Sequence, residues 1–262
     1  REIGIKLLFQ EIKTFFKIIK IIKSIRVKNP DLIVHTHSTK AGIIGRWAAF
    51  FAGARIRIHT IHGFGFNDYQ SKLMWAMLFS LEYASCLITS HYVCVSIKDK
   101  SYGEKMFPNF IKKCSIIRAG IENDSFFIPV RKYYDFKPKS SFIIGTISCF
   151  KPQKNLHDLL KAFKLLHSRL ANKNIHIVLQ IIGDGIQRNE IEEWIFNNNI
   201  VENIQLFGWQ KNVFGWMKNW DLLVMSSLWE GLPCTVVEAR AAHIPVVAYD
   251  VGGIFEVIKN NK

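Results

Sequence analysis

The sequence predicts an α/β fold made of two doubly wound domains. Short apolar segments alternate with amphipathic segments of about ten to fifteen residues, a pattern typical of a parallel sheet with helices on both faces. This alternation breaks once, near the middle of the chain, and then restarts. The 262 residues, of which 49% are hydrophobic, suffice for two modest cores and exclude a disordered or low-complexity protein.

The first domain is predicted over residues 1–124. It begins with an amphipathic helix at residues 5–27, which Asn29 and Pro30 end. The next predicted elements are, in order, a strand at 31–35, a helix at 40–51, a strand at 55–60, a helix at 72–84, a strand at 87–95, a helix ending near 107 and a strand at 114–118.

The opening helix has one basic side and one apolar side. The basic side holds Lys6, Lys13, Lys17 and Lys20. The apolar side holds Ile5, Leu8, Ile12, Phe15, Phe16, Ile19 and Ile22. This helix either docks on a sheet with its basic side in solvent or contacts anionic lipid headgroups.

A linker is predicted at residues 125–141, because prolines and clustered polar residues interrupt the alternation there. The second domain follows over residues 142–262. Its predicted elements are strands at 142–148, 175–182, 204–207, 222–225 and 245–248, and helices at 156–170, 190–197, 234–242 and from 254 onward. We expect a ligand to bind in a cleft between the domains, at the carboxyl ends of the strands.

The charge balance points to anionic partners. The chain carries 35 Lys and Arg against 21 Asp and Glu, a net charge of +14, which suits phosphorylated ligands, nucleic acid or an acidic membrane surface. The chain has no run of 18 apolar residues. It opens on Arg1 without an initiator methionine or a signal peptide, and we expect it to be a fragment of a longer protein.

The cysteines are scattered and have no spacing typical of a disulfide framework or a zinc site. They are Cys86, Cys94, Cys114, Cys149 and Cys234. Their distribution favours a reducing compartment, and we expect a cytoplasmic protein that contacts the inner face of the cell membrane peripherally.

The densest group of candidate functional residues lies between 226 and 240. A strand ends at Met225, and Pro233 lies in the first turn of the following helix, so the amides of Cys234 and Thr235 are available to a phosphate. Glu230 precedes the helix, and Glu238 lies one turn inside it. The two carboxylates either accept hydrogen bonds from sugar hydroxyls or simply cap the positive end of the helix dipole.

Glu230 and Glu238 are separated by seven residues in a Ser-x-x-Glu-Gly-Leu-Pro setting. This segment resembles the E-x7-E signature of retaining family-4 glycosyltransferases, whose GT-B fold has two Rossmann-like domains facing a cleft. The resemblance implies that Glu238 holds the nucleotide ribose and that Glu230 engages the donor sugar. It also implies that the intervening backbone meets the diphosphate, at Gly231, Leu232, Pro233, Cys234 and Thr235. Both domains are truncated relative to the family pattern.

Three other segments of the second domain resemble the same family. Residues 145–155 are similar to its G-R-L-x-P-Q-K-G/N segment, which makes Lys154 the diphosphate-binding lysine. Cys149 stands where the family has an arginine, and Lys151 is the candidate to replace it. Gly183 lies in a segment similar to the family's G-D/E-G turn, and residues 207–209 resemble its F-x-G segment beside the nucleobase.

Two histidine-containing segments of the first domain resemble the family's D-x-V-H-T-H and T-x-H-G-F segments. They place His35, His37 and His62 after predicted strands. The resemblance implies that His62 lies close to the donor sugar and the acceptor. A metal site at these histidines is not expected, because no carboxylate or cysteine completes a ligand set.

The resemblance implies a retaining glycosyltransferase that moves a sugar from a UDP- or GDP-sugar to a glycan or lipid-linked acceptor in envelope or surface polysaccharide synthesis. It implies His62 and Glu230 as catalytic residues, no metal cofactor, and a leaving phosphate that helps deprotonate the acceptor. The alternatives are a nucleotide-sugar epimerase or hydrolase on the same two-domain plan, or a basic nucleic-acid-binding module. The last has no helix-turn-helix, finger or RNA-binding signature in its favour.

Overall fold

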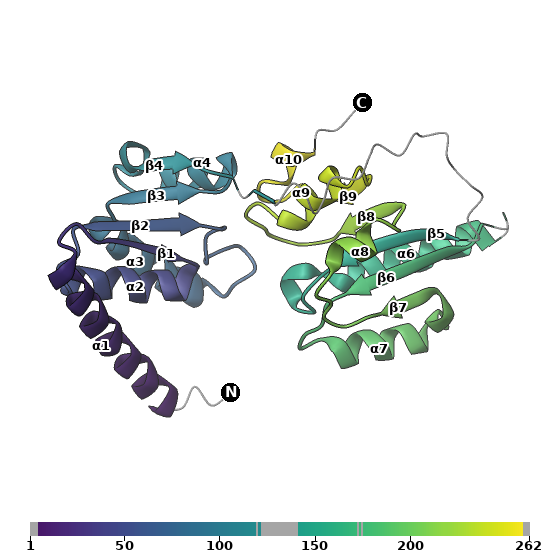
Figure 1. Ribbon diagram of the computed structural model, residues 1–262. Coiled ribbons are helices and arrows are strands. Elements are labelled where there is room, and N and C mark those ends of the chain that lie inside the picture. The colour runs from purple at the N-terminus through teal and green to yellow at the C-terminus, as the bar shows by residue number, and fades with distance from the viewer. Residues whose placement is uncertain (1–4, 119, 122–140, 172, 174, 259–262) are drawn as a thin grey trace. The chain divides into compact units, whose positions relative to one another are not determined.

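The computed structural model describes residues 5–118, 120–121, 141–171, 173 and 175–258. The chain divides into two compact units, unit 1 at Arg1–Arg118 and unit 2 at Ala119–Lys262. Each unit is described by itself (Figure 1). The predicted linker at 125–141 lies outside the described residues except for Ser141, and the predicted cleft between the domains remains a prediction.

Unit 1 contains a four-stranded parallel sheet with the strand order β1-β2-β3-β4. Among the described residues this order has no reversal, so successive crossovers step in one direction. The strands are β1 Ile33–His37, β2 Ile56–Ile61, β3 His91–Cys94 and β4 Cys114–Ile116. The helices are α1 Ile5–Lys28, α2 Thr39–Phe51, α3 Lys72–Ile88, α4 Ile97–Met106 and the short η1 Phe110–Lys113.

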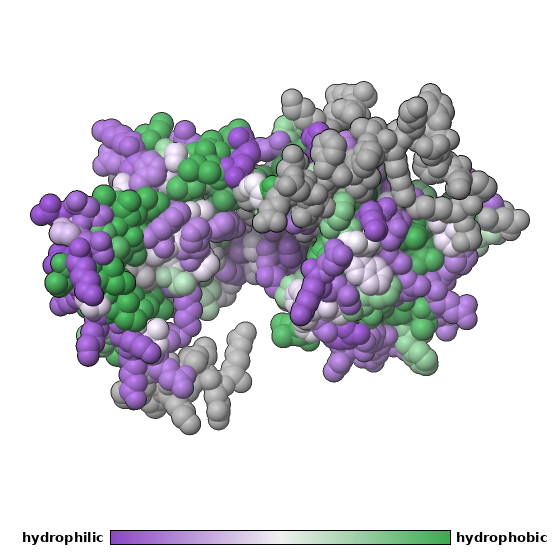
Figure 2. Space-filling view, in the orientation of Figure 1, coloured by the Kyte–Doolittle hydropathy of each residue, from purple (hydrophilic) through white to green (hydrophobic). Residues whose placement is uncertain are grey.

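Helix α1 packs mainly on α2 rather than directly on the sheet. Its Phe15, Ile18, Ile19 and Ile22 contact a surface of small side chains, so the two helices approach closely. Those side chains are Ala48, Ala49, Ala52 and Ala54. The basic side of α1, with Lys13, Lys17 and Lys20, stays exposed, and Figure 2 shows hydrophobic and hydrophilic side chains side by side on this part of unit 1.

Unit 2 contains a five-stranded parallel sheet with the order β7-β6-β5-β8-β9. The chain moves from β5 outward to β7 and then returns to the other side of β5, which is the reversal of a doubly wound sheet. The strands are β5 Phe142–Ile147, β6 Ile177–Ile182, β7 Ile204–Leu206, β8 Leu222–Met225 and β9 Val246–Ala248. The helices are η2 Pro152–Lys154, α6 Leu156–Ala171, α7 Arg188–Asn197, η3 Val201–Asn203, α8 Val213–Met217, α9 Cys234–Ala241 and α10 Ile254–Val257.

The predicted α/β fold with parallel sheets is confirmed, and two local predictions are wrong. The helix predicted at 72–84 continues to Ile88, so the strand predicted at 87–95 shortens to His91–Cys94. The residues buried along this segment, Glu82, Ser85, Cys86 and Ile88, recur at helical spacing. Helix α8 was not predicted; the Asn212 side chain caps it by accepting a hydrogen bond from the Gly215 amide.

Candidate functional site

In unit 2, two loops at the carboxyl ends of neighbouring strands are joined by hydrogen bonds. The β5–α6 loop holds residues 148–155, and the β8–α9 loop holds residues 226–233. The Leu228 amide donates to the Gln153 carbonyl at 2.8 Å, and the Gln153 side chain donates to the Trp229 carbonyl at 2.7 Å. The Ser226 hydroxyl donates to the Lys154 carbonyl at 2.9 Å. Each of the two loops was predicted to bind the donor, and these hydrogen bonds fix their positions relative to each other.

The predicted residues Lys154 and Glu230 meet across these loops. The Lys154 Nζ donates to the Glu230 Oε1 at 2.5 Å, and the two side chains are only 19% and 11% exposed. The pair carries no net charge. An anion near this loop therefore does not face an uncompensated carboxylate at Glu230, which removes the charge conflict that two acidic residues beside a phosphate site would create.

Helix α9 begins at Cys234, and Pro233 precedes it as the N-cap residue. The sequence predicted Pro233 in the first turn of the helix. In the structure it lies just outside the helix. Gly231, Leu232 and Pro233 are buried, whereas Cys234 is exposed. Contact between this segment and a ligand would therefore involve the backbone near the helix start and the Cys234 side chain, because the Leu232 side chain packs inside the protein.

Glu238 lies one turn into α9 and is half-buried. Burial raises the pKa of its carboxyl group above the ordinary value. Burial also raises the pKa of the Cys234 thiol, and the negative charge of Glu238 adds to that effect. Both groups therefore hold their protons to higher pH than they would in water.

A glycine turn after β9 supports the loop that carries Glu230. Gly252 has a φ of +58°, and a Cβ at this position would lie 2.1 Å from the Glu230 carbonyl oxygen. The neighbouring Gly253 amide donates to the Gly231 carbonyl at 2.6 Å. The sequence analysis missed this turn, although a Gly-Gly pair between a strand and a helix was the available signal.

Position 183 requires a glycine because of its backbone conformation and the close approach of a neighbouring loop. Gly183 has a φ of +122°, and a Cβ there would lie 2.0 Å from the Ser148 carbonyl oxygen. Its amide donates to the Gly208 carbonyl at 2.8 Å. The close approach is thus to the β5–α6 loop, and a contact between Gly183 and a donor stays a prediction. In the adjacent F-x-G-like segment, Phe207 packs on Trp216 and Trp209 is 66% exposed.

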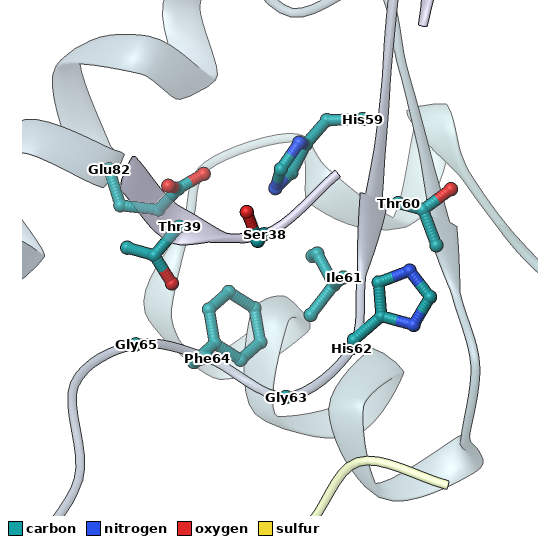
Figure 3. A pocket seen from close by; sticks show the side chains of 10 residues that line it. All are labelled: Ser38, Thr39, His59, Thr60, Ile61, His62, Gly63, Phe64, Gly65 and Glu82. Atoms are coloured by element: carbon teal, nitrogen blue, oxygen red, sulfur yellow. The ribbon is translucent and has the colours of Figure 1, made fainter. Parts of the chain in front are cut away.

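In unit 1, the predicted histidines lie at the carboxyl ends of β1 and β2. His37 Nδ1 and His62 Nε2 are 3.1 Å apart, and His35 Nε2 lies 2.7 Å from the Thr60 hydroxyl. Figure 3 shows His62 at a pocket between the β1–α2 turn and the β2–α3 loop. The pocket is lined by Ser38, Thr39, His59, Thr60, Ile61, His62, Gly63, Phe64, Gly65 and Glu82.

A buried ion pair lies beside this pocket. The Arg46 guanidinium, which is fully buried, donates to both oxygens of Glu82 at 2.7 and 2.8 Å. It also donates to the Thr89 and Tyr92 hydroxyls, each at 3.1 Å. The sequence analysis missed this pair; its signal was a charged residue in the interior of each of two largely apolar helices, well after the lysine in the first turn of each.

His59 is buried next to this pair. Its Nδ1 lies 2.9 Å from the Thr36 hydroxyl. Burial, and then the positive charge of Arg46, lower the pKa of His59 to about 3. His59 is therefore neutral at physiological pH and serves as a packed polar core residue.

The described residues contain neither a cluster of metal ligands nor a helix that could span a membrane. No three histidine, cysteine, aspartate or glutamate side chains there gather as metal ligands would. Within the same ranges, no helix combines the length and the apolar character that crossing a membrane demands.

Comparison with known proteins explains the two units. Residues 5–125 match the family described as Glycosyltransferase Family 4, and residues 134–262 match Glycosyl transferases group 1. Both matches are to glycosyltransferase families, one in each unit. The chain shares its fold with the crystal structure of Anabaena HepE in complex with UDP and glucose, with a TM-score of 0.74, 16% identity, and coverage of 93% of this chain and 65% of that one.

Two bacterial relatives are named as glycosyltransferases. The Escherichia coli UDP-Gal:alpha-D-GlcNAc-diphosphoundecaprenol alpha-1,3-galactosyltransferase is 29% identical over 97% of this chain and 65% of its own length. The Staphylococcus aureus capsular polysaccharide biosynthesis glycosyltransferase CapM is 24% identical over 97% of this chain and 67% of its own. The chain thus spans about two thirds of the length of these relatives.

Proposed function

We propose that this glycosyltransferase transfers a sugar, with retention of anomeric configuration, from a UDP-sugar to a glycan or lipid-linked acceptor in surface polysaccharide synthesis. The observation that carries the proposal is the Lys154–Glu230 pair, held by joined loops at the carboxyl ends of β5 and β8. The galactosyltransferase named above and the HepE complex support a UDP-linked donor. A nucleotide-sugar epimerase or hydrolase is not favoured, because the named relatives are transferases.

Unit 2 supplies the donor site in this proposal. Lys154 and the backbone at the start of α9 stabilise the charge that develops on the departing diphosphate. Glu230 accepts a hydrogen bond from the donor sugar, and Glu238 accepts one from the ribose. Lys151 takes the place of the family's arginine. No metal is needed, because the lysine and the amides provide the positive charge.

Unit 1 supplies the acceptor side. His62 contacts the donor sugar near the reacting carbon, and the leaving phosphate takes the proton from the acceptor hydroxyl. Holding the reactants in this geometry is where we expect most of the rate gain to arise.

Isothermal titration with UDP and steady-state kinetics test these assignments together. We expect Glu238→Ala to weaken UDP binding and Glu230→Ala mainly to lower kcat. Glu193→Ala, which removes an exposed carboxylate of the same unit, is the control and should leave both unchanged. Unchanged UDP affinity in Glu238→Ala would contradict the ribose assignment, and equal UDP release with and without acceptor would indicate a hydrolase.

We further propose that α1 places the enzyme against an anionic membrane. The exposed side chains of this helix include Lys13, Lys17 and Lys20 together with Phe16 and Ile21, a combination that suits lipid headgroups. The triple Lys→Glu variant should lose sedimentation with phosphatidylglycerol vesicles, whereas neutral phosphatidylcholine vesicles should bind neither protein. Equal sedimentation of both proteins with the anionic vesicles would contradict this proposal.

A further inference from the structure

His37 and His62 form a side-chain pair on one face of the unit 1 sheet. In the β1–β2 register His37 lies opposite Thr60, and His62 follows two residues later, so the three side chains share a face. The His37 Nδ1 to His62 Nε2 distance is 3.1 Å, and the ring centroids are 5.4 Å apart. Both residues keep part of their surface in solvent, so this contact is not imposed by core packing.

The pairing determines which nitrogen of His62 can meet a substrate. Its Nε2 is engaged by His37, and the nitrogen left for a substrate is Nδ1. We propose that His37 is a positioning residue that holds the His62 ring so that Nδ1 faces the reacting sugar. This inference rests on the proposed function, in which His62 contacts the donor sugar.

The hydrogen bond needs one proton between the two facing nitrogens. If His62 donates from Nε2, its Nδ1 is an acceptor for a sugar hydroxyl; if His37 donates from Nδ1, the His62 Nδ1 carries a hydrogen and is a donor. Either arrangement fixes one tautomer of His62. A proton on both facing nitrogens would place two donors against each other and break the contact.

The surrounding groups favour a neutral His62. Burial lowers its pKa, and the neighbouring imidazoles of His37 and then His35 lower the pKa further. The His35 ring lies tilted against the His37 ring, with centroids 4.5 Å apart, and His59, from the same strand as Thr60, is itself neutral at physiological pH.

The helices that follow β1 and β2 contribute a buried cation and a buried anion near the pocket. Arg46 of α2 and Glu82 of α3 pair with each other at 2.7 Å, so their charges largely cancel. Activity that depends on neutral His62 is therefore retained at neutral pH and lost as the pH falls through the lowered pKa of His62.

Three variants separate positioning from general damage. His37→Phe keeps a ring but removes the hydrogen bond, and we expect kcat to fall about tenfold with little change in the donor KM. His37→Asn places a polar atom near the former Nδ1 and should restore most of kcat. His35→Phe, on the same strand and face but without a bond to His62, is the matched control and should change kcat less than about twofold.

The pH profile and the imidazole signals supply readouts that a purely structural role would not move. Removing the His37 imidazole should raise the pKa of His62, so the acid limb of kcat/KM should shift to higher pH in His37→Phe, and less in His35→Phe. Long-range proton–nitrogen NMR on histidine-labelled full chain should show one His62 tautomer in the native protein and a mixture in His37→Phe.

The two proposals fail in different ways. An unchanged His62 tautomer and pKa in His37→Phe would overturn the positioning role, whatever the activity. A fully active His62→Ala would instead refute the assignment of His62 to the donor sugar, whereas a single His62 tautomer in the native protein that becomes a mixture in His37→Phe would still support the contact between the two histidines.

Discussion

The two units hold their candidate residues by different kinds of contact. In unit 2, opposite charges meet at Lys154 and Glu230, and a glycine turn at Gly252 supports the loop from behind. In unit 1, the exposed partners are the imidazoles of His37 and His62. Unit 1 also contains the Arg46–Glu82 ion pair, which is more deeply buried. Its Arg46 guanidinium donates hydrogen bonds to neighbouring hydroxyls.

The two ion pairs differ in exposure: one lies at the candidate site near the surface, and the other lies in the core of unit 1. The Lys154–Glu230 pair is 19% and 11% exposed, whereas the Arg46–Glu82 pair is 0% and 5% exposed. Removing one charge from a core leaves the other without solvent, but removing one charge near the surface leaves a group that water can reach. We therefore expect the unit 1 pair to govern stability and the unit 2 pair to govern activity.

The largest expected effect is on the stability of unit 1. Arg46→Met leaves Glu82 buried without its partner, and the free energy of unfolding of unit 1 should fall by about 3–5 kcal/mol. Hydrogen exchange with mass spectrometry can follow each unit separately. The double variant Arg46→Met/Glu82→Leu, which removes both charges, should recover most of the loss; a mild effect of the single change would erase the contrast between the two pairs.

The next effect concerns catalysis in unit 2. Lys154→Met should lower kcat/KM by about 100- to 1000-fold, the cost of losing one charge-stabilising group, about 2.7–4 kcal/mol. Its melting temperature should change little. Lys161→Met, an exposed lysine of α6, is the control. If Lys154→Met unfolds the protein but retains kcat/KM per folded molecule, the Lys154–Glu230 pair governs stability and not activity, which would contradict the prediction.

A smaller effect should follow from the glycine turn. Gly252→Ala places a Cβ against the Glu230 carbonyl, and we expect kcat to fall about tenfold as the carboxylate moves. Gly208 has a similar φ of +64° but open space around it, so Gly208→Ala should cost only backbone strain, about 1 kcal/mol of stability. Equal activity of the two variants would show that Glu230 does not depend on the turn.

The smallest effect is on cysteine labelling. Exposed Cys234 should react with a maleimide, while buried Cys86 and Cys94 of unit 1 should not. Because burial and Glu238 raise the pKa of the Cys234 thiol, the rate should keep rising at pH values where an ordinary thiol is already ionised. UDP should slow labelling several-fold, as read by mass spectrometry, and Cys234→Ser marks the site; labelling unaffected by saturating UDP would place the nucleotide elsewhere.

The elements could be predicted because their apolar residues recur with different periods in strands and helices. The prediction failed where one apolar run satisfies both periods, as between Leu81 and Val95. Motif spacing identified Lys154 and Glu230 separately. Their contact depends on β5 and β8 being neighbours in the sheet, and no local pattern in the sequence encodes that adjacency.

Contacts that depend on how two distant backbone segments approach each other could not be predicted from the sequence either. The support of Glu230 by Gly252 requires knowing how two loops cross. The His37–His62 bond depends on the β1–β2 register, which places His37 opposite Thr60. The three histidines were singled out as strand-end residues, but the bond between His37 and His62 was not predicted.

The lysine–carboxylate pair of unit 2 has a consequence for selectivity. In the proposed complex, a diphosphate that draws the Lys154 ammonium toward itself frees a Glu230 oxygen, which can then accept from a hydroxyl of the transferred sugar. Binding of the diphosphate by Lys154 and binding of the sugar by Glu230 are therefore coupled, because both require the Lys154–Glu230 ion pair to separate. A nucleotide lacking its sugar, or a sugar lacking its nucleotide, would form only one of these two contacts and should bind more weakly than the intact molecule.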